Sequence, residues 1–321
     1  MKPFQKYLDC VNQAIAAIPY PSDPGCLYEP IAYHMALGGK RIRPVLLMMA
    51  CDALGGDTAM AIDAAVGLEM FHNFTLLHDD VMDNADVRRG KPTVHRRWND
   101  NTAILSGDTM LTIATQYIAR TGDWQVMDLF NKTAIEIYEG QQWDMDYEGR
   151  NDVTVDEYIK MIRLKTSVLL GCALKMGALI ADADSQQADL FYQAGVNLGL
   201  AFQLRDDVLD VWGDEATFGK EIGGDIMNNK KTFLLINAMH LASGDDADEL
   251  RHWLNDPYAT RDNKVAGVTR LYERLGVRQL AEDAITDYSG QAVAAFSQLK
   301  INDDDKQAFV DLTGKLSGRK F

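Results

Sequence analysis

Apolar residues recur at spacings of three and four residues along nearly the whole chain. This spacing places them on one face of an α-helix, whereas the alternation typical of a half-buried strand is scarce. The pattern therefore predicts an all-α protein without a parallel sheet. The expected helices, whose ends follow proline and glycine breakers, cover residues 2–18, 26–38, 42–54, 58–84, 101–121, 125–147, 154–182, 185–213, 227–243, 246–255, 261–275, 278–299 and 302–317.

Two of the expected helices, 58–84 and 185–213, are long and apolar around much of their circumference. Helices of this kind occupy the middle of a bundle, where neighbouring helices cover every face. No linker, low-complexity segment or repeat interrupts the pattern. We therefore expect one large helical domain over residues 1–321.

Composition narrows the class of protein. The chain has 321 residues, 47% hydrophobic and 25% charged, which is typical of a globular protein with a large core. Its net charge of −15 argues against nucleic acid or an anionic membrane surface as the main partner. No apolar run approaches the ~20 residues of a membrane span, and the N-terminus lacks a secretory signal pattern. We expect a cytoplasmic protein without stable membrane insertion.

The cysteines support a reducing compartment. They show neither CxxC pairing nor metal-ligand spacing. We therefore expect them to be free thiols, which neither form disulfides nor bind zinc. The four are Cys10, Cys26, Cys51 and Cys172.

Two aspartate clusters share one spacing, DDVMD at 79–83 and DDVLD at 206–210. Within a helix, residues four apart fall on one face, so Asp79 and Asp83 project together, as do Asp206 and Asp210. A solvated acidic patch is the alternative, but both clusters follow apolar residues. Carboxylates without histidine or thiolate suit Mg²⁺, which commonly bridges one or two of them to phosphate oxygens. The clusters therefore predict chemistry on a diphosphate.

Basic segments accompany these acids. GGKRIRP at 38–44 opens a helix, where backbone N–H groups also favour anions, and RRGKPT at 88–93 follows the first acid cluster closely. Guanidinium groups bind phosphate oxygens bidentately. Lys165, Lys220 and Lys230 are further cations. Taken alone each would be an ordinary surface charge, but their pairing with metal-type acids indicates phosphate binding.

Three other polar residues have two interpretations each. His72 and His78 are either satisfied core histidines or members of the site, and Gln203 is either a buried packing amide or a hydrogen-bond partner within the site. No Ser-His-Asp or Cys-His nucleophile arrangement is evident.

The motifs GGKRIRP, DDVMDNADVRRGKPT, GQQWD, KT, FQLRDDVLD and GKEIGGDIMNNKKT occur in this order between Gly38 and Thr232. With them the chain resembles the all-trans polyprenyl diphosphate synthases of the class I isoprenoid synthase superfamily. The resemblance implies an isoprenoid synthase bundle with a central apolar cavity, assembled as a homodimer. It also implies the coupling of isopentenyl diphosphate to an allylic diphosphate by ionisation, condensation and proton loss.

The resemblance assigns roles to individual residues. Asp79 and Asp83 would ligate two Mg²⁺ ions and Asp206 a third, with Asp80, Asp207 and Asp210 in supporting or water-mediated roles. The residues expected to hold the allylic diphosphate are Arg88, Lys165, Thr166, Gln203, Lys220 and Lys230. Those expected to hold isopentenyl diphosphate are Lys40, Arg43, His72 and Arg89. The set expected to act in catalysis is Asp79, Asp80, Asp83, Arg88, Lys165, Asp206 and Lys220.

Product length is expected to depend on residues upstream of the first acid motif. A growing prenyl tail would run back along helix 58–84, and Phe71, Phe74 and Thr75 lie on its path. At 1.5 Å per residue, Phe74 is ~7.5 Å and Phe71 ~12 Å below Asp79, which leaves room for a short tail. Bacterial farnesyl enzymes commonly carry an insertion in the motif, and many farnesyl enzymes carry an aromatic residue where Thr75 stands. We therefore expect geranylgeranyl diphosphate, with farnesyl diphosphate as the next choice.

Three other readings remain. A class I terpene cyclase shares the first motif, but its second metal site normally mixes Asn, Ser and Glu. A non-catalytic regulatory subunit of a heteromeric prenyl synthase would have eroded acid motifs, and both motifs are intact here. An acidic interaction module would not require the ordered cations.

Overall fold

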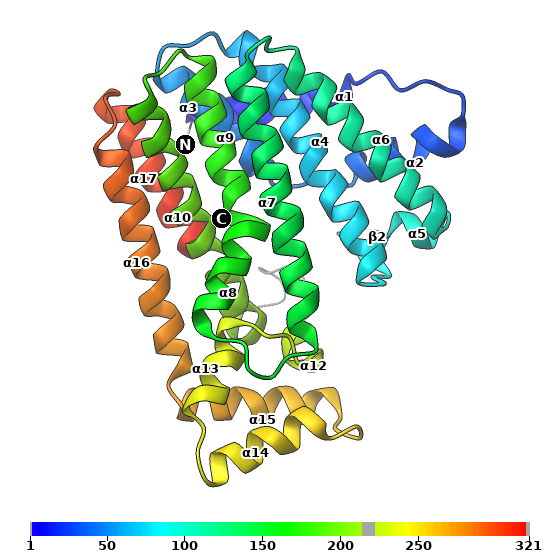
Figure 1. The fold of residues 1–321 in the computed structure, drawn as a ribbon, viewed down its shortest axis with the longest axis vertical. Helices are drawn as coiled ribbons and strands as arrows, with labels where there is room; N and C mark the ends of the chain where they lie inside the picture. Colours follow the sequence, from blue (N-terminus) through cyan, green and yellow to red (C-terminus); the bar gives the residue numbers. More distant parts are fainter. Residues whose placement is uncertain (1, 214–221, 319–321) are drawn as a thin grey trace. The chain divides into compact units, whose positions relative to one another are not determined.

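A computed structural model describes residues 2–213 and 222–318 of the protein, residues 2 and 3 by their backbone alone. Its residues are overwhelmingly helical, which confirms the all-α prediction (Figure 1). The earlier elements are α1 (Lys2–Ala16), α2 (Gly25–Ala36), α3 (Ile42–Ala53), α4 (Thr58–Met82), β1 (Val87–Arg88), β2 (Lys91–Pro92), α5 (Val94–Arg97), α6 (Asp100–Ala119) and α7 (Trp124–Glu148). The later ones are α8 (Val155–Ile162), η1 (Arg163–Ser167), α9 (Val168–Ile180), α10 (Ser185–Trp212), α12 (Gly224–Met227), α13 (Phe233–Leu241), α14 (Asp245–Asn255), α15 (Arg261–Arg274), α16 (Val277–Ser297) and α17 (Asp303–Gly318).

The chain divides into two compact units. Unit 1 comprises Met1–Asn131, Cys172–Tyr192 and Leu299–Ala308. Unit 2 comprises Lys132–Gly171, Gln193–Gln298 and Phe309–Phe321. The first acid motif therefore belongs to unit 1 and the second to unit 2. A single domain over the whole chain stays a prediction.

Helix α4 forms the core of unit 1. Its N-terminus is capped by Asp57, whose carboxylate accepts a hydrogen bond from the backbone N–H of Ala59 at 2.8 Å. α4 packs against α3 and α6, and its buried side chains include Leu68, Met70 and Phe71. Because apolar residues surround most of the helix, it is covered on several sides, as its sequence predicts.

A two-stranded hairpin follows α4, and the sequence pattern did not predict it. Strands β1 and β2 pair antiparallel with Arg88 opposite Lys91. Arg89 and Gly90 form the two-residue turn, and both have positive φ, 52° and 73°. Such turns match the twist of a hairpin, but Arg-Gly is a much weaker signal than Asn-Gly. The short helix α5 after the hairpin was likewise not expected.

Two expected helices are interrupted. The segment predicted as one helix over 154–182 consists of α8, a π-helical turn η1 and α9. Periodicity cannot show this, because a π-turn adds one residue to the ladder while hydrophobic positions continue on either side. The segment predicted over 227–243 is regular only from Phe233, where Thr232 caps α13 by accepting from the backbone N–H of Leu235.

Unit 2 contains α13, which packs against α8, α15 and α16. α14 packs along α15 (Figure 1). Phe296 of α16 and Phe309 of α17 stack with ring centroids 4.8 Å apart, so the two helices are in contact there. In the described part of the chain, no helix has both the length and the apolar character needed to cross a bilayer.

Candidate active site

The first acid motif lies at the C-terminal end of α4. Asp79 is half-buried, Asp80 is buried and Asp83 is exposed. The backbone N–H of Asp83 donates to the carbonyl of Asp79 at 2.8 Å, so the two residues are one helical turn apart on the same face. The helix C-terminus adds partial negative charge to these carboxylates. A cation is therefore the ligand that this end of α4 favours.

Asp80 is engaged by Arg88 from strand β1. The Nε of Arg88 donates to both carboxylate oxygens of Asp80 at 2.9 and 2.8 Å, and its Nη2 lies 2.7 Å from Oδ1. Burial raises the pKa of Asp80, and Arg88 opposes that shift. A guanidinium has five N–H donors, so Arg88 keeps others available for a phosphate oxygen while it holds Asp80.

A second arginine of the hairpin, Arg89, contacts the glycine loop that follows α2 at Gly38 and Gly39. Arg89 donates a hydrogen bond from Nη1 to the carbonyl of Gly38. A Cβ on Gly39, whose φ is 145°, would come within 3.0 Å of the Arg89 guanidinium. The positive φ is what favours glycine at this position, and the absent side chain leaves room for Arg89. Lys40, the next residue, is exposed.

Arg41 is a buried residue that sequence reasoning left without a role. It has a left-handed backbone, with φ of 48°, and its Nη1 pairs with Glu69 on α4 at 2.6 Å. Its Nη2 donates to the carbonyl of Met35 at 2.9 Å, and Asn73 donates to the same Glu69 oxygen at 3.1 Å. This network fixes the start of α3 on α4. The GGKRIRP motif alone does not indicate which of its cations faces inward.

Arg43 and His72, both predicted site residues, are brought together. The Nη1 of Arg43 lies 3.1 Å from Nε2 of His72. Because a guanidinium only donates, His72 accepts through Nε2 and is neutral. Burial lowers the pKa of His72 well below its usual value, and Arg43 and Arg89 lower it further. Several arginines therefore lie close enough to act electrostatically on His72.

The second acid motif lies near the end of α10 and is held from within unit 2. Tyr158 of α8 donates its hydroxyl hydrogen to Oδ2 of Asp207, which is buried. Gln203 donates to Oδ1 of the same residue at 3.2 Å, and Thr166 donates to Oε1, the side-chain amide oxygen of Gln203, at 3.4 Å. Burial, together with Asp225, raises the pKa of Asp207 to about 8. This carboxylate is therefore buried close to another acidic side chain, Asp225. Asp206, the neighbouring residue, is half-buried.

Asp210 supports the loop after α10. Its Oδ2 accepts a hydrogen bond from the backbone N–H of Asp225 at 3.0 Å, and its carbonyl accepts from Gly223 at 2.6 Å. Gly223 has φ of 80°, and its Cβ position would meet Val265 at 2.6 Å, so glycine is required there. Asp210 thus orders the segment that brings Asp225 next to the second motif.

Two lysines lie beside a carboxylate that the sequence analysis had not assigned. Lys165 donates from Nζ to Oδ2 of Asp144 at 2.6 Å. Burial would raise the pKa of Asp144, but Lys230 and Lys165 outweigh it and lower that pKa. The motif GQQWD, which ends in Asp144, was the available signal. Lys220, the third expected lysine, lies outside the described residues.

The residues expected to limit product length form an aromatic group on α4. Phe71 and Phe74 lie 5.6 Å apart, and Phe71 meets Phe130 of α7 edge to face at 5.1 Å. Phe74 also contacts the His78 ring at 4.8 Å. Thr75 turns its hydroxyl back to the carbonyl of His72 at 2.8 Å. Phe130 was missed because sequence spacing does not reveal contacts between helices.

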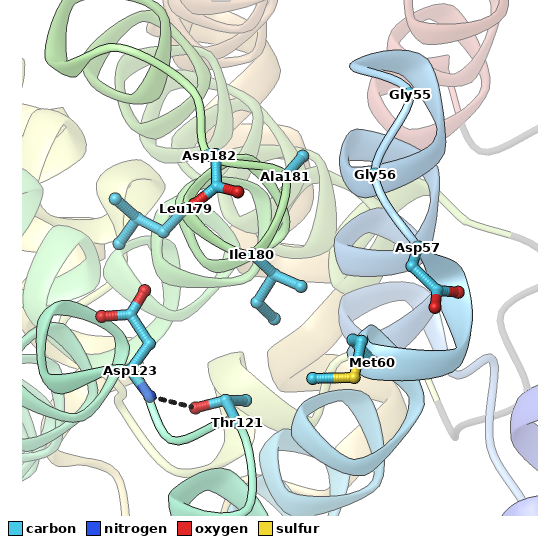
Figure 2. A pocket seen from close by; sticks show the side chains of 10 residues that line it. All are labelled: Gly55, Gly56, Asp57, Met60, Thr121, Asp123, Leu179, Ile180, Ala181 and Asp182. Atoms are coloured by element: carbon cyan, nitrogen blue, oxygen red, sulfur yellow. Dashed lines mark hydrogen bonds between the residues drawn. The ribbon is translucent and has the colours of Figure 1, made fainter.

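A surface pocket of about 450 Å³ lies elsewhere in unit 1, at the opposite end of α4. Figure 2 shows its lining residues, among them Met60, Ile180 and three aspartates. Asp57 and Asp123 accept hydrogen bonds from the backbone at the starts of α4 and α7, which accounts for their presence. The pocket contains none of the predicted site residues, so we assign it no part in the chemistry.

Within residues 2–213 and 222–318, no three histidine, cysteine or acidic side chains already stand close enough to hold a metal ion. The donors present are nevertheless of one chemical kind. Asp79, Asp83 and Asp206 offer carboxylate oxygens, which are the ligands of hard divalent cations.

Comparisons with known proteins show which family the chain resembles. A family model described as "Polyprenyl synthetase" matches residues 24–275. A geranylgeranyl diphosphate synthase of Methanosarcina mazei is 42% identical over 233 residues, which cover 71% of this chain and 72% of that protein. A crystal structure of a geranylgeranyl pyrophosphate synthase is similar with a TM-score of 0.92 at 43% identity, and the match covers 100% of this chain and 98% of the other.

A further solved structure was obtained with ligands. It is a polyprenyl synthase from Caulobacter crescentus complexed with calcium and isoprenyl diphosphate. It is 28% identical to this chain with a TM-score of 0.90, covering 99% of this chain and 96% of that one.

Proposed function

Since the chain belongs to the polyprenyl synthetase family and is a short-chain all-trans prenyltransferase, we propose that it condenses isopentenyl diphosphate with an allylic diphosphate. The allylic C–O bond breaks, a carbon–carbon bond forms to isopentenyl diphosphate, and a proton is lost from the joined product. The released diphosphate is the proposed acceptor of that proton, which suits a site where no nucleophile–base pair was found in the sequence.

The observation that carries the proposal is the charge pattern of unit 1. Arg43 lies 3.1 Å from His72, Arg88 binds the carboxylate of Asp80 in the first acid motif, and both of these partners lie on α4. A cationic group beside a set of metal-type acids is what binding of a metal-bound diphosphate requires.

Divalent metal is proposed as the cofactor, in the form of three Mg²⁺ ions. Asp79, Asp83 and Asp206 would hold them, and the diphosphate oxygens and water would complete the coordination. When bound, Mg²⁺ neutralises the charge that develops on the departing diphosphate. Asp80 and Asp207 would act through Arg88 and Tyr158, since their carboxylates already accept hydrogen bonds from those residues. Asp210 would act by ordering the loop at Asp225.

Isopentenyl diphosphate is proposed to bind at the glycine loop of unit 1. Lys40 and Arg89 are exposed there, and Arg43 lies next to the neutral His72. Arg41 is committed to Glu69, so it would position the loop without touching substrate. A neutral His72 avoids a further buried positive charge beside Arg43 and leaves its Nδ1–H as a donor to an oxygen.

The allylic diphosphate is proposed to bind Arg88 in unit 1 together with Lys165, Lys220 and Lys230, helped by Thr166 and Gln203. Cations held in place before ionisation stabilise the leaving group more than the ground state, because the leaving group gains charge as the bond breaks. Apolar surroundings would keep water from the carbocation.

The product is proposed to be geranylgeranyl diphosphate, with farnesyl diphosphate as the second choice. Phe74 and Phe71 are both buried on α4, upstream of the acids, and Phe130 joins them. Such a group would stop a growing tail after a few isoprene units.

Assay of the purified chain tests the proposal directly. It is incubated with Mg²⁺, isopentenyl diphosphate and an allylic primer, and products are identified by mass spectrometry. Elongation supports the proposal, cyclised hydrocarbon would indicate a terpene cyclase, and no product would indicate a regulatory subunit. Glu139→Ala, an exposed acid on α7, is the matched control for loss of activity in Asp79→Ala.

Assembly and location are also proposals. A homodimer rests on the family alone, and its mass in solution can be measured by light scattering. A cytoplasmic location rests on the cysteine pattern, which lacks the paired spacing of a disulfide framework.

A further inference from the structure

A π-helical turn carries two of the proposed substrate-binding residues. η1 spans Arg163–Ser167 and contains Lys165 and Thr166. The Ser167 hydroxyl donates to the carbonyl of Ile162 at 3.3 Å, five residues earlier. π-Turns are less favourable than α-helix, so they persist where surrounding contacts hold them, and they occur frequently at functional sites.

Glycines from two other helices lie against this turn. A Cβ on Gly140 of α7 would come 2.3 Å from the backbone nitrogen of Lys165 and 2.7 Å from its Cα. A Cβ on Gly199 of α10 would come 2.5 Å from the Cα of Ser167. The atoms met are backbone atoms, which cannot rotate away as a flexible side chain can. Glycine at both places is therefore what allows the turn to lie so close to α7 and α10.

The side chain of Lys165 is held from the same face of α7. Asp144 is four residues after Gly140, so both residues project toward η1. Its carboxylate accepts from the Lys165 ammonium group at 2.6 Å, with 18% of the aspartate and 24% of the lysine side chain exposed. Lys230 also interacts electrostatically with Asp144. This carboxylate therefore attracts two of the lysines assigned to the allylic diphosphate. Gly140 thus sets the backbone of Lys165, and Asp144 sets its side chain.

We propose that Gly140 and Asp144 are positioning residues, which place Lys165 and Thr166 for the allylic diphosphate without touching it. This inference rests on the proposed function, because it takes Lys165 as a ligand of the allylic diphosphate. The GQQWD motif then has a physical role: its glycine leaves room for the backbone of η1, and its aspartate binds the Lys165 side chain.

The two residues predict different responses to substitution. Gly140→Ala displaces the π-turn, so the KM for the allylic diphosphate rises and kcat falls together, by roughly a hundredfold in kcat/KM for a displacement near 1 Å. The KM for isopentenyl diphosphate stays within about twofold. Gly290→Ala is the matched control, since a Cβ at that helical glycine meets nothing within 4 Å.

Asp144→Asn separates positioning from binding. The lysines keep their charge and a repelling carboxylate is lost, so inorganic diphosphate with Mg²⁺ should bind at least as tightly by calorimetry. Lys165 exchanges its ion pair for a weaker hydrogen bond to a neutral amide oxygen and is held less firmly, so kcat should fall by about tenfold. If Asp144 merely supported the fold, its substitution would lower the unfolding temperature and would not reduce kcat while leaving diphosphate binding unchanged. Since Asp144→Asn preserves shape, it decides the matter if Gly140→Ala fails to fold.

Lys165→Ala distinguishes the failure of this inference from failure of the proposed function. If Lys165→Ala binds inorganic diphosphate as tightly as the unchanged chain, Lys165 is not a diphosphate ligand and that assignment in the proposed function is wrong. If Lys165→Ala weakens binding while Asp144→Asn and folded Gly140→Ala keep full kcat, the proposed function stands and the positioning inference is overturned.

Discussion

The buried hydroxyl of Tyr158 donates its hydrogen bond to Asp207, the second residue of the second acid motif. Tyr158 belongs to α8 and Asp207 to α10, so one hydrogen bond ties the motif to a neighbouring helix. The partner of an acid motif can therefore be an uncharged residue that carries no motif of its own.

Tyr158→Phe should lower the free energy of unfolding by about 1–3 kcal/mol, because Asp207 would lose a donor while remaining buried. Urea denaturation measures this change. Tyr258→Phe is the control, since Tyr258 is 89% exposed and its substitution should have no effect. Equal stability of the two variants would show that the hydroxyl contributes nothing to Asp207.

Asp79→Ala and Asp206→Ala should each reduce turnover by several orders of magnitude, because each removes a proposed Mg²⁺ ligand. Neither side chain is fully buried, so the folded state should persist and circular dichroism should be unchanged. Steady-state rates at saturating Mg²⁺ provide the measurement. Near-normal elongation by either variant would refute the metal role assigned to that residue.

Phe74→Ala should lengthen the product by at least one isoprene unit, because it removes a buried ring upstream of the acids. Loss of that ring should also cost about 3–5 kcal/mol of stability. Mass spectrometry of the products gives the length. Phe309→Ala serves as control, since this fully buried ring of unit 2 should cost similar stability without altering length. Unchanged length in Phe74→Ala would move the limit to Phe71 or Phe130.

Stability should fall as the pH drops below about 6.5, because His34 titrates only in the unfolded chain there. Burial lowers the pKa of His34 to about 3, and Arg88, Arg89 and Arg41 contribute, while Asn73 opposes the shift. The unfolded chain then binds a proton that the folded chain does not. This single group makes the free energy of unfolding decrease by up to about 1.4 kcal/mol per pH unit down to pH 3.

Urea midpoints between pH 7 and pH 5 measure this dependence. His34→Gln should flatten the curve, whereas His240→Gln, at an exposed position on α13, should leave its slope unchanged. An unaltered slope in His34→Gln would assign the pH dependence to other groups.

Helical periodicity was sufficient to place both acid motifs on long buried helices, since the 3.6-residue repeat fixes which side chains share a face. It could not predict the turn at Arg89 and Gly90, where the backbone is left-handed and the Arg89 side chain binds the distant Gly38 carbonyl. Nor could it predict η1, because glycines of two other helices provide the space in which that turn lies. The predicted site residues were found beside partners that only tertiary structure reveals, such as Tyr158 and Asp144.

Helix α4 carries Glu69, which anchors the glycine loop through Arg41, and ten residues later it carries Asp79. The helix thus fixes the angle about its axis between the residue that anchors the glycine loop and the first residue of the acid motif. An extra residue inserted between these two positions would turn Asp79 by about 100° about the helix axis, while the loop stayed anchored. The number of residues between Glu69 and Asp79 is consequently fixed by the rotation of the helix, so an insertion there should be harmful even where the added residue favours a helix.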